Sequence, residues 1–262
     1  MSDLVALPVE LEPVNQNLPC GRICDEYAKE AQLIQSSLVP VKGLCHDSIE
    51  IAFRSIPFSE VGGDFADFFR LPDGLFGIYL GDVVGKGLPA AMYSALVMGT
   101  LRGIHKTGTD TAGVLTRLNE RRVQRPIPGR FCSTLYALSN PATRELIFSN
   151  AGMTLPLLAS QTISPLGDGG LPSGMFPGAT YQRHVVQLGP GDCVLFASDG
   201  LHELCNGQGV EFCTARMNEV WAQCRRKSAT ESVDFVVDRL LAFSDGAAPH
   251  DDITAVVLKV LS

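Results

Sequence analysis

The stretch "DFADFFRLPDGLFGIYLGDVVGKGLP", residues 64–89, indicates how the chain folds. Its two apolar segments, 64–71 and 75–82, are rich in aromatic residues and have the length of strands. The Pro-Asp-Gly sequence at 72–74 is typical of a tight turn. We therefore predict that the two segments form an antiparallel hairpin.

Short apolar segments separated by turns continue along the chain. Strands are predicted at 48–56, 131–138, 145–149, 154–159, 181–188, 192–198 and 253–261. Helices are predicted at 88–106, 110–124, 211–224 and 229–243. The first helix is apolar nearly all round, which predicts burial, and Asp110 is a suitable N-cap for the second. Because hairpins outnumber alternating strands and helices, we predict an α+β fold of two antiparallel sheets flanked by helices.

The N-terminal part differs from the rest in its pattern. Residues 1–24 are Pro-rich and aperiodic and are interpreted as a tail. A helix is predicted over 25–39, with Asp25 as N-cap and Pro40 just beyond its end. Its apolar stripe comprises Tyr27, Ala31, Ile34 and Leu38. The stripe fits either packing on its own domain or binding a partner. The predicted organisation is a tail, a linker or partner helix over 25–40, and one domain over 41–262.

Composition limits the classes of function. The 262 residues are 45% hydrophobic and 19% charged, as in an ordinary globular protein, and the net charge of −7 disfavours nucleic-acid binding. Eight cysteines without a C-x-x-C pair indicate reduced thiols. The N-terminus lacks the basic region of a signal peptide. No apolar run approaches the ~18 residues that span a membrane, so a cytoplasmic protein is expected.

The segment "LGDVVGKGLP", residues 80–89, is similar in composition to a nucleotide-binding loop. A phosphate loop has four residues between its first glycine and its Gly-Lys pair, followed by Ser or Thr. Here Gly81 and Gly85 enclose only three residues, and Gly87 occupies the hydroxyl position. The spacing argues against a nucleotide site, although the start of the next helix could attract an anion.

Acidic residues stand where apolar strands meet turns. Asp64, Asp82 and Asp199 each lie beside a glycine, and Asp251 and Asp252 precede the last predicted strand. Aspartate is common in turns, but a neighbouring glycine also lets backbones approach closely. Two carboxylates ~4 Å apart repel by roughly 1–4 kcal/mol, so their convergence requires protonation or a divalent cation. Oxygen ligands without a His or Cys cluster favour Mg²⁺ or Mn²⁺ over Zn²⁺.

Five segments in series resemble the motifs of the PPM (2C-like) metal-dependent serine/threonine protein phosphatases. They are "EVGGDFADFF" (60–69), "GDVVGKGLPAAM" (81–92), "NAGMTLPLL" (150–158), "LGPGDCVLFASDGLHE" (188–203) and "DDITAVVLKV" (251–260). The resemblance covers roughly residues 26–261 and is greatest to the bacterial SpoIIE-like branch. It implies an α-β-β-α sandwich with a two-metal centre at one end, and it makes 41–262 a SpoIIE-like phosphatase domain.

The resemblance also implies roles for individual positions. The implied metal ligands are Asp64, Asp82, the carbonyl of Val83, Asp199 and Asp251. Asp82 resembles the carboxylate that bridges both ions. Asp64 resembles a ligand of one metal site, and Asp199 and Asp251 resemble ligands of the site on the opposite side. Asp251 is preferred to Asp252 because distant members of the family keep an acid only at the first position.

Some residues depart from the family pattern or have no metal role. Met153 stands where the family usually has His, and His202 where it often has Thr. Met153 could alter substrate contacts. His202 is interpreted either as a simply solvated residue or as an aid to proton transfer near pH 7. Lys86 is interpreted as structural or regulatory, and Asp67 as a strand residue without a metal role. Arg54 is interpreted as a surface residue, with contact to the substrate phosphate as the alternative.

The resemblance implies hydrolysis of phosphoserine or phosphothreonine on a regulatory protein, an anti-sigma-factor antagonist. Two Mn²⁺ or Mg²⁺ ions would activate the attacking water. One alternative is a pseudophosphatase that binds a phosphoprotein without turnover. A nucleotide-binding regulator rests only on the loop at 80–89. Helix 25–40 implies a homodimer or a separate regulatory partner.

Overall fold

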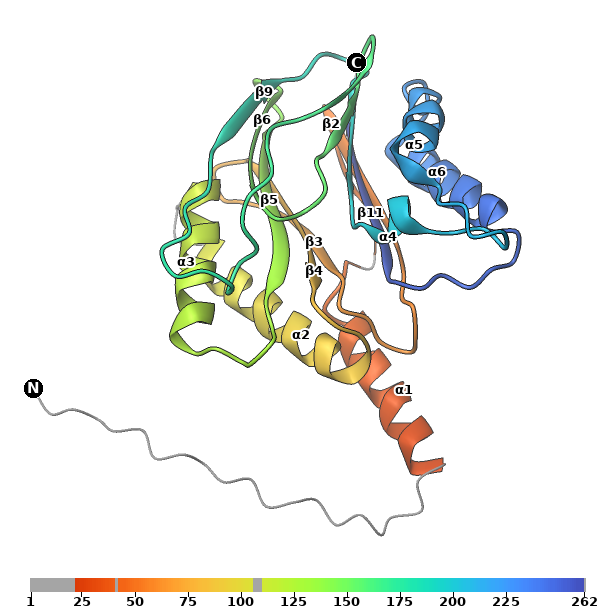
Figure 1. The fold of residues 1–262 in the computed structure, drawn as a ribbon. Helices are drawn as coiled ribbons and strands as arrows, with labels where there is room; N and C mark the ends of the chain where they lie inside the picture. Colours follow the sequence, from red (N-terminus) through yellow and green to blue (C-terminus); the bar gives the residue numbers. More distant parts are fainter. Residues whose placement is uncertain (1–21, 41, 106–109, 262) are drawn as a thin grey trace, which may run out of the picture.

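The computed structural model describes residues 22–40, 42–105 and 110–261, and its strands form two antiparallel sheets packed face to face (Figure 1). The first sheet has the order β1 (Leu44–His46), β2 (Ile49–Ile56), β11 (Ile253–Val260), β10 (Cys193–Ala197), β7 (Leu157–Ala159) and β8 (Ile163–Pro165). The second has the order β3 (Phe65–Arg70), β4 (Phe76–Val83), β5 (Cys132–Asn140), β6 (Glu145–Ala151) and β9 (His184–Gln187).

Helices cover the outer faces of both sheets (Figure 1). The second sheet is covered by α2 (Gly87–Ile104) and α3 (Thr111–Gln124). The first is covered by α4 (Gly200–Glu203), α5 (Cys213–Ala222) and α6 (Ala229–Ser244). A further helix, α1 (Arg22–Ser36), contacts α2 and extends away from the sandwich (Figure 1). The predicted α-β-β-α sandwich is confirmed.

Alternation of side chains on the central strands produces three apolar cores. On β11, Val256 and Leu258 face the other sheet, whereas Ala255 and Val257 face the helices. All of its residues are buried, because both of its faces are covered. A third core lies between the second sheet and the helices α2 and α3. Strands buried on both sides explain why the sequence shows apolar runs rather than a strict alternation.

Local sequence signals predicted several elements correctly. β3 and β4 pair as an antiparallel hairpin, with Phe65 opposite Gly81. Gly74 closes the turn with a φ of 85°, which glycine adopts without strain. The carboxylate of Asp110 caps α3 by accepting a hydrogen bond from the N–H of Gly113 at 2.7 Å.

Other expectations were wrong in detail. α1 begins at Arg22, so Asp25 is not its N-cap. α2 is not buried all round, since the side chains of Leu88 and Met92 are exposed. The short elements β1, β8 and α4 were not predicted, because pieces of three or four residues carry too little periodicity.

Three further expectations concern the ends, the membrane and the thiols. Most of the predicted tail, residues 1–21, lies outside the described part of the chain. No helix that the structure describes combines the length and apolar character needed to cross a bilayer. The described cysteines at 45, 132, 193, 205, 213 and 224 are free thiols.

Candidate functional site

Five aspartates gather at one end of the sandwich, and we call them the acidic edge: Asp64, Asp82, Asp199, Asp251 and Asp252. Asp64 directly precedes β3 and Asp82 is near the end of β4, which the hairpin register brings together. Asp199 follows β10 and the other two acids precede β11, its partner in the first sheet. Both sheets therefore contribute acids to the same end of the fold.

The acidic edge is crowded with negative charge. Burial raises the pKa of Asp64 well above its usual value; Asp82 and Asp252 raise it further, against hydrogen bonds from Ser198 and Thr254. Burial, followed by the charges of the other acids across the edge, raises the pKa of Asp82 to about 7. Each carboxylate destabilises the ionised form of its neighbours. A bound cation would relieve this repulsion.

The adjacent acids Asp251 and Asp252 have different environments. The buried carboxylate of Asp252 accepts hydrogen bonds from the backbone N–H groups of Phe58 at 2.6 Å, Gly63 at 2.6 Å and Asp64 at 3.3 Å. Asp251 is more exposed and forms an ion pair with Lys86, with 3.2 Å between its Oδ2 and Nζ. The Asp252 carboxylate thus holds the loop before β3, whereas Asp251 accepts a hydrogen bond at Oδ1 from the N–H of Asp252 at 2.9 Å and pairs with Lys86 through Oδ2.

Glycines allow the backbones of the acidic edge to approach closely. A Cβ on Gly62 would lie 2.5 Å from Oδ2 of Asp252, and one on Gly200 would lie 2.1 Å from its carbonyl oxygen. Both distances are too short for real atoms, so any side chain would push the loop away. The glycines beside the acids in the sequence therefore have a packing reason.

Lys86 lies at the acidic edge, at the N-cap position of α2. Besides its ion pair with Asp251, the ammonium group donates a hydrogen bond to the carbonyl of His250 and lies 4.6 Å from the ring centroid of Phe58. These contacts agree with the prediction of a structural or regulatory lysine. They place a positive charge against a candidate metal ligand, which the sequence did not indicate.

Two residues that the sequence did not single out hold the backbone of the edge. Gln35 of α1 donates from Nε2 to the carbonyl of Gly62 at 2.6 Å and accepts from the N–H of Gly62 at 3.0 Å. Arg130 donates a hydrogen bond to the carbonyl of Val84, beside Gly85. Nothing local in the sequence distinguishes these side chains from other surface glutamines and arginines.

The departures from the family pattern have distinct environments. Met153 is buried in the core between the sheets, and its backbone is held by Asn150 through hydrogen bonds of 2.8 and 2.9 Å. Asp82 and Asp199 line a cavity of about 40 Å³ together with Met153. His202 is not simply solvated: its Nδ1 is buried without a hydrogen-bond partner among the described residues, and burial lowers its pKa, against the charge of Asp199.

Arg54 and Asp67 both form ion pairs with helices. Arg54 binds Asp234 of α6, with 2.6 Å between Nη1 and Oδ1, which agrees with its interpretation as a surface residue. Asp67 binds Arg102 of α2 at 2.8 Å and accepts a hydrogen bond from the hydroxyl of Tyr79 at 3.0 Å. Both pairs fasten helices to sheets.

The donor chemistry of the acidic edge fits a hard divalent cation. Its side chains offer carboxylate oxygens, which Mg²⁺ and Mn²⁺ prefer. Oδ2 of Asp64 is buried without a hydrogen-bond partner among the described residues, as expected for an oxygen that binds a cation. No three His, Cys, Asp or Glu side chains within 22–40, 42–105 and 110–261 form a closed metal-binding cluster. The donors therefore lie at the same end of the fold, but in the described part of the chain no three of them surround a single point.

Comparison with known sequences identifies relatives along most of the chain. Residues 72–261 match the family described as Stage II sporulation protein E (SpoIIE). The chain is 27% identical over 229 residues to the phosphoserine phosphatase RsbU of Bacillus subtilis, covering 86% of this chain and 68% of the relative. It is 24% identical over 261 residues to protein IcfG of Synechocystis, covering 88% of this chain but only 41% of that protein.

Solved structures share the fold. The SiaA-PP2C domain of Pseudomonas aeruginosa superposes with a TM-score of 0.79 at 20% identity, covering 90% of this chain and 97% of that chain. RsbX in complex with magnesium superposes with a TM-score of 0.63 at 15% identity, covering 84% of this chain and 98% of that chain.

The sandwich, its acidic edge and these relatives together define a protein phosphatase of the PP2C-like (PPM) class. Within that class, the chain belongs to the SpoIIE family.

Proposed function

We propose that the chain hydrolyses phosphoserine or phosphothreonine on a regulatory protein, an anti-sigma-factor antagonist. The meeting of Asp64, Asp82, Asp199 and Asp251, far apart in sequence, at one edge of the two sheets carries the proposal. The name of the relative RsbU, a phosphoserine phosphatase, supports this type of bond. The match covers only 41% of protein IcfG, so the proposal takes no support from that relative.

The proposed cofactors are two Mn²⁺ or Mg²⁺ ions held by the four aspartates and the carbonyl of Val83. Such ions, when bound, would neutralise the phosphoryl group and make water a nucleophile at neutral pH. The magnesium bound to the structural relative RsbX supports this choice of metal. Asp82 has the central role because it shares a small cavity with Asp199 and lies across the hairpin from Asp64.

The chain's other residues position this machinery. Asp252 holds the loop that carries Asp64 by accepting backbone hydrogen bonds. Cys132, opposite Val83 in the sheet, is no candidate nucleophile, because burial raises the pKa of its thiol to about 12. Direct attack by water is therefore the proposed route, without a phosphorylated enzyme intermediate.

The proposal is tested by metal-dependent release of phosphate from a phosphoserine peptide. We expect release with millimolar Mn²⁺ or Mg²⁺, none in EDTA, and recovery when metal is restored. Release that continues unchanged in EDTA would contradict the metal-dependent mechanism. Calorimetric binding of Mn²⁺ and of the peptide without any release would instead support the pseudophosphatase alternative.

We expect Gln35→Ala to lower kcat about tenfold, because Gln35 fixes Gly62 and therefore the loop before Asp64. The control is Glu30→Ala on the same helix, whose side chain is exposed and does not line the pocket that Gln35 shares with Gly62 and Asp64. Steady-state kinetics at saturating Mn²⁺ measures both variants. Equal rates for the two variants would show that α1 does not position the site.

We also propose that α1 and α2 together form a surface for a second copy of this chain. Ile34 of α1 and Met92 of α2 line an apolar groove of about 160 Å³, and both side chains are mostly exposed. Exposed apolar groups that adjoin each other are typical of interfaces. We expect sedimentation to show a dimer that Ile34→Ser/Met92→Ser converts to monomer. A wild-type monomer at high micromolar concentration would contradict this proposal.

A further inference from the structure

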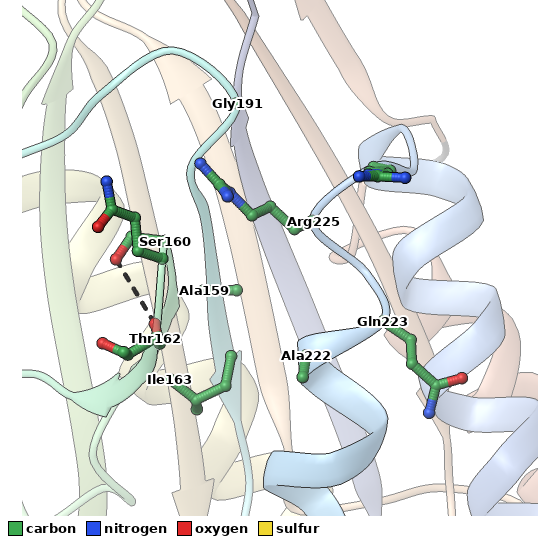
Figure 2. Close-up of a pocket in the computed structure, with 10 residues that line it drawn as sticks. Ala159, Ser160, Thr162, Ile163, Gly191, Ala222, Gln223 and Arg225 are labelled. Atoms are coloured by element: carbon green, nitrogen blue, oxygen red, sulfur yellow. Dashed lines mark hydrogen bonds between the residues drawn. The ribbon is translucent and has the colours of Figure 1, made fainter.

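A hollow of about 740 Å³ lies between the edge of the first sheet and the segment that joins α5 to α6. We call it the distal groove. It is lined by the β7–β8 turn at 159–163, by Gly191, and by residues 222, 223, 225 and 226 (Figure 2). Its volume is in the range of pockets that bind small molecules.

The distal groove is far from the acidic edge. Gly191 precedes strand β10 and Asp199 follows it, so the length of this strand separates the groove from the acidic edge. Eight residues of extended chain span roughly 25 Å. The groove and the acidic edge therefore lie at opposite ends of the sheet, and a ligand in the groove would not be the phosphoryl group that is hydrolysed.

Buried contacts hold the walls of the groove in place. The indole N–H of Trp221, which is fully buried, donates a hydrogen bond to the carbonyl of Leu157 at 3.0 Å and so ties α5 to β7. The ammonium of Lys259, which is 7% exposed, donates to the carbonyl of Gly191 at 2.8 Å and to that of Arg225. These bonds connect both sides of the groove, so its shape is largely preformed.

The lining carries positive charge and no acid. Arg225 and Arg226 line the groove, and neither guanidinium has an ion-pair partner among the described residues. Figure 2 shows Arg225 extending across the groove toward Gly191. The nearby Asp192 is buried and accepts a hydrogen bond from the N–H of Gly189 at 2.7 Å, outside the lining. Two unpaired guanidiniums in a chain of net charge −7 indicate an anionic ligand.

The opposite wall supplies neutral polar groups. Ser160 and Thr162 face Arg225 from the β7–β8 turn (Figure 2), and Gln161 also lines the groove. Their hydroxyl and amide groups can donate hydrogen bonds, as can the guanidinium groups across the groove. A phosphate group, with up to two negative charges and several acceptor oxygens, matches this combination better than a single carboxylate does.

We propose that the distal groove binds a phosphate group, either as inorganic phosphate or as the phosphate of a small phosphorylated metabolite. Arg225 and Arg226 neutralise the charge, and the 160–162 turn donates to the remaining oxygens. The metabolite's carbon part would lie against the apolar side chains of Ala159, Ile163 and Ala222. This site is separate from the acidic edge and does not depend on the proposed phosphatase activity.

Isothermal titration calorimetry in EDTA tests the proposal with two probes, inorganic phosphate and phenylphosphonate, an ester mimic that the enzyme cannot hydrolyse. EDTA removes metal-dependent binding at the acidic edge. We expect wild type to bind at least one probe at millimolar concentration, and Arg225→Ala/Arg226→Ala to bind at least about tenfold more weakly. Tighter binding of phenylphosphonate would indicate a metabolite, and tighter binding of phosphate would indicate the free ion.

Two control variants separate a specific site from general charge. Arg121→Ala/Arg183→Ala removes the same charge from exposed positions that do not line the groove, and should bind as wild type does. Arg225→Lys keeps the charge but loses the planar fork, and should bind more weakly than wild type. Absence of binding by wild type, or equal binding by the two double variants, would overturn the proposal.

Discussion

Asp82→Ala is expected to abolish metal-dependent phosphate release, with a fall of at least about 10³-fold in kcat/KM. Burial raises the pKa of Asp82 to about 7, and the charges of Asp199, Asp251 and Asp252 contribute to this rise. A carboxylate in this central position is the proposed bridge between both ions. Its loss would disturb the whole centre rather than one side of it.

The same substitution should not weaken the fold. Asp82 is partly buried among like charges, so alanine removes repulsion and desolvation, which offsets the loss of its hydrogen bond from the backbone N–H of Val83. We expect the thermal midpoint in EDTA to stay equal or to rise. Loss of activity together with retained stability would identify a functional residue rather than a structural one.

The control for this experiment is Asp168→Ala, which removes an exposed acid distant in sequence from the edge. It should keep the wild-type rate with a phosphoserine peptide and with a generic aryl phosphate. If Asp82→Ala and Asp168→Ala release phosphate at the same rate, the proposed reaction at the acidic edge is wrong.

Substitutions of the adjacent acids Asp251 and Asp252 are expected to affect activity and stability differently. Asp252→Ala is expected to lower the free energy of unfolding by about 3–5 kcal/mol, because it leaves the buried N–H groups of Gly63 and Asp64, and the part-buried N–H of Phe58, without their acceptor. Asp251→Ala should change it by no more than about 1 kcal/mol, since its ion pair with Lys86 is half exposed. Asp251→Ala should nevertheless remove activity.

Urea unfolding and steady-state kinetics together measure this contrast. Asp251→Ala should be folded and inactive at all Mn²⁺ concentrations up to the millimolar range. Asp252→Ala should have a lower urea midpoint with an unchanged slope. An active Asp251→Ala, or an Asp252→Ala as stable as wild type, would reverse the roles assigned to these two residues.

Residues close in sequence were the easiest to predict. The hairpin over 64–82 and the Asp110 cap depend on contacts within a few residues, and the structure has both. The stripe on α1 could be recognised, but not whether it is covered. The structure leaves Tyr27 and Ile34 mostly exposed, because α1 contacts the sandwich mainly through α2. An amphipathic pattern predicts which face of a helix is apolar, but the neighbouring elements determine what covers that face.

The amino-acid sequence by itself determined the sandwich, the order of its strands along the chain and the set of acids at the ends of strands. These follow from turn residues, apolar runs and glycines that act over short distances. Only the tertiary structure decided that Asp252 holds the loop at Gly63, 189 residues away, and that Lys86 faces His250, 164 residues away. The difference arises because a hydrogen bond or ion pair forms between groups that are adjacent in space, and packing of the two sheets sets that adjacency.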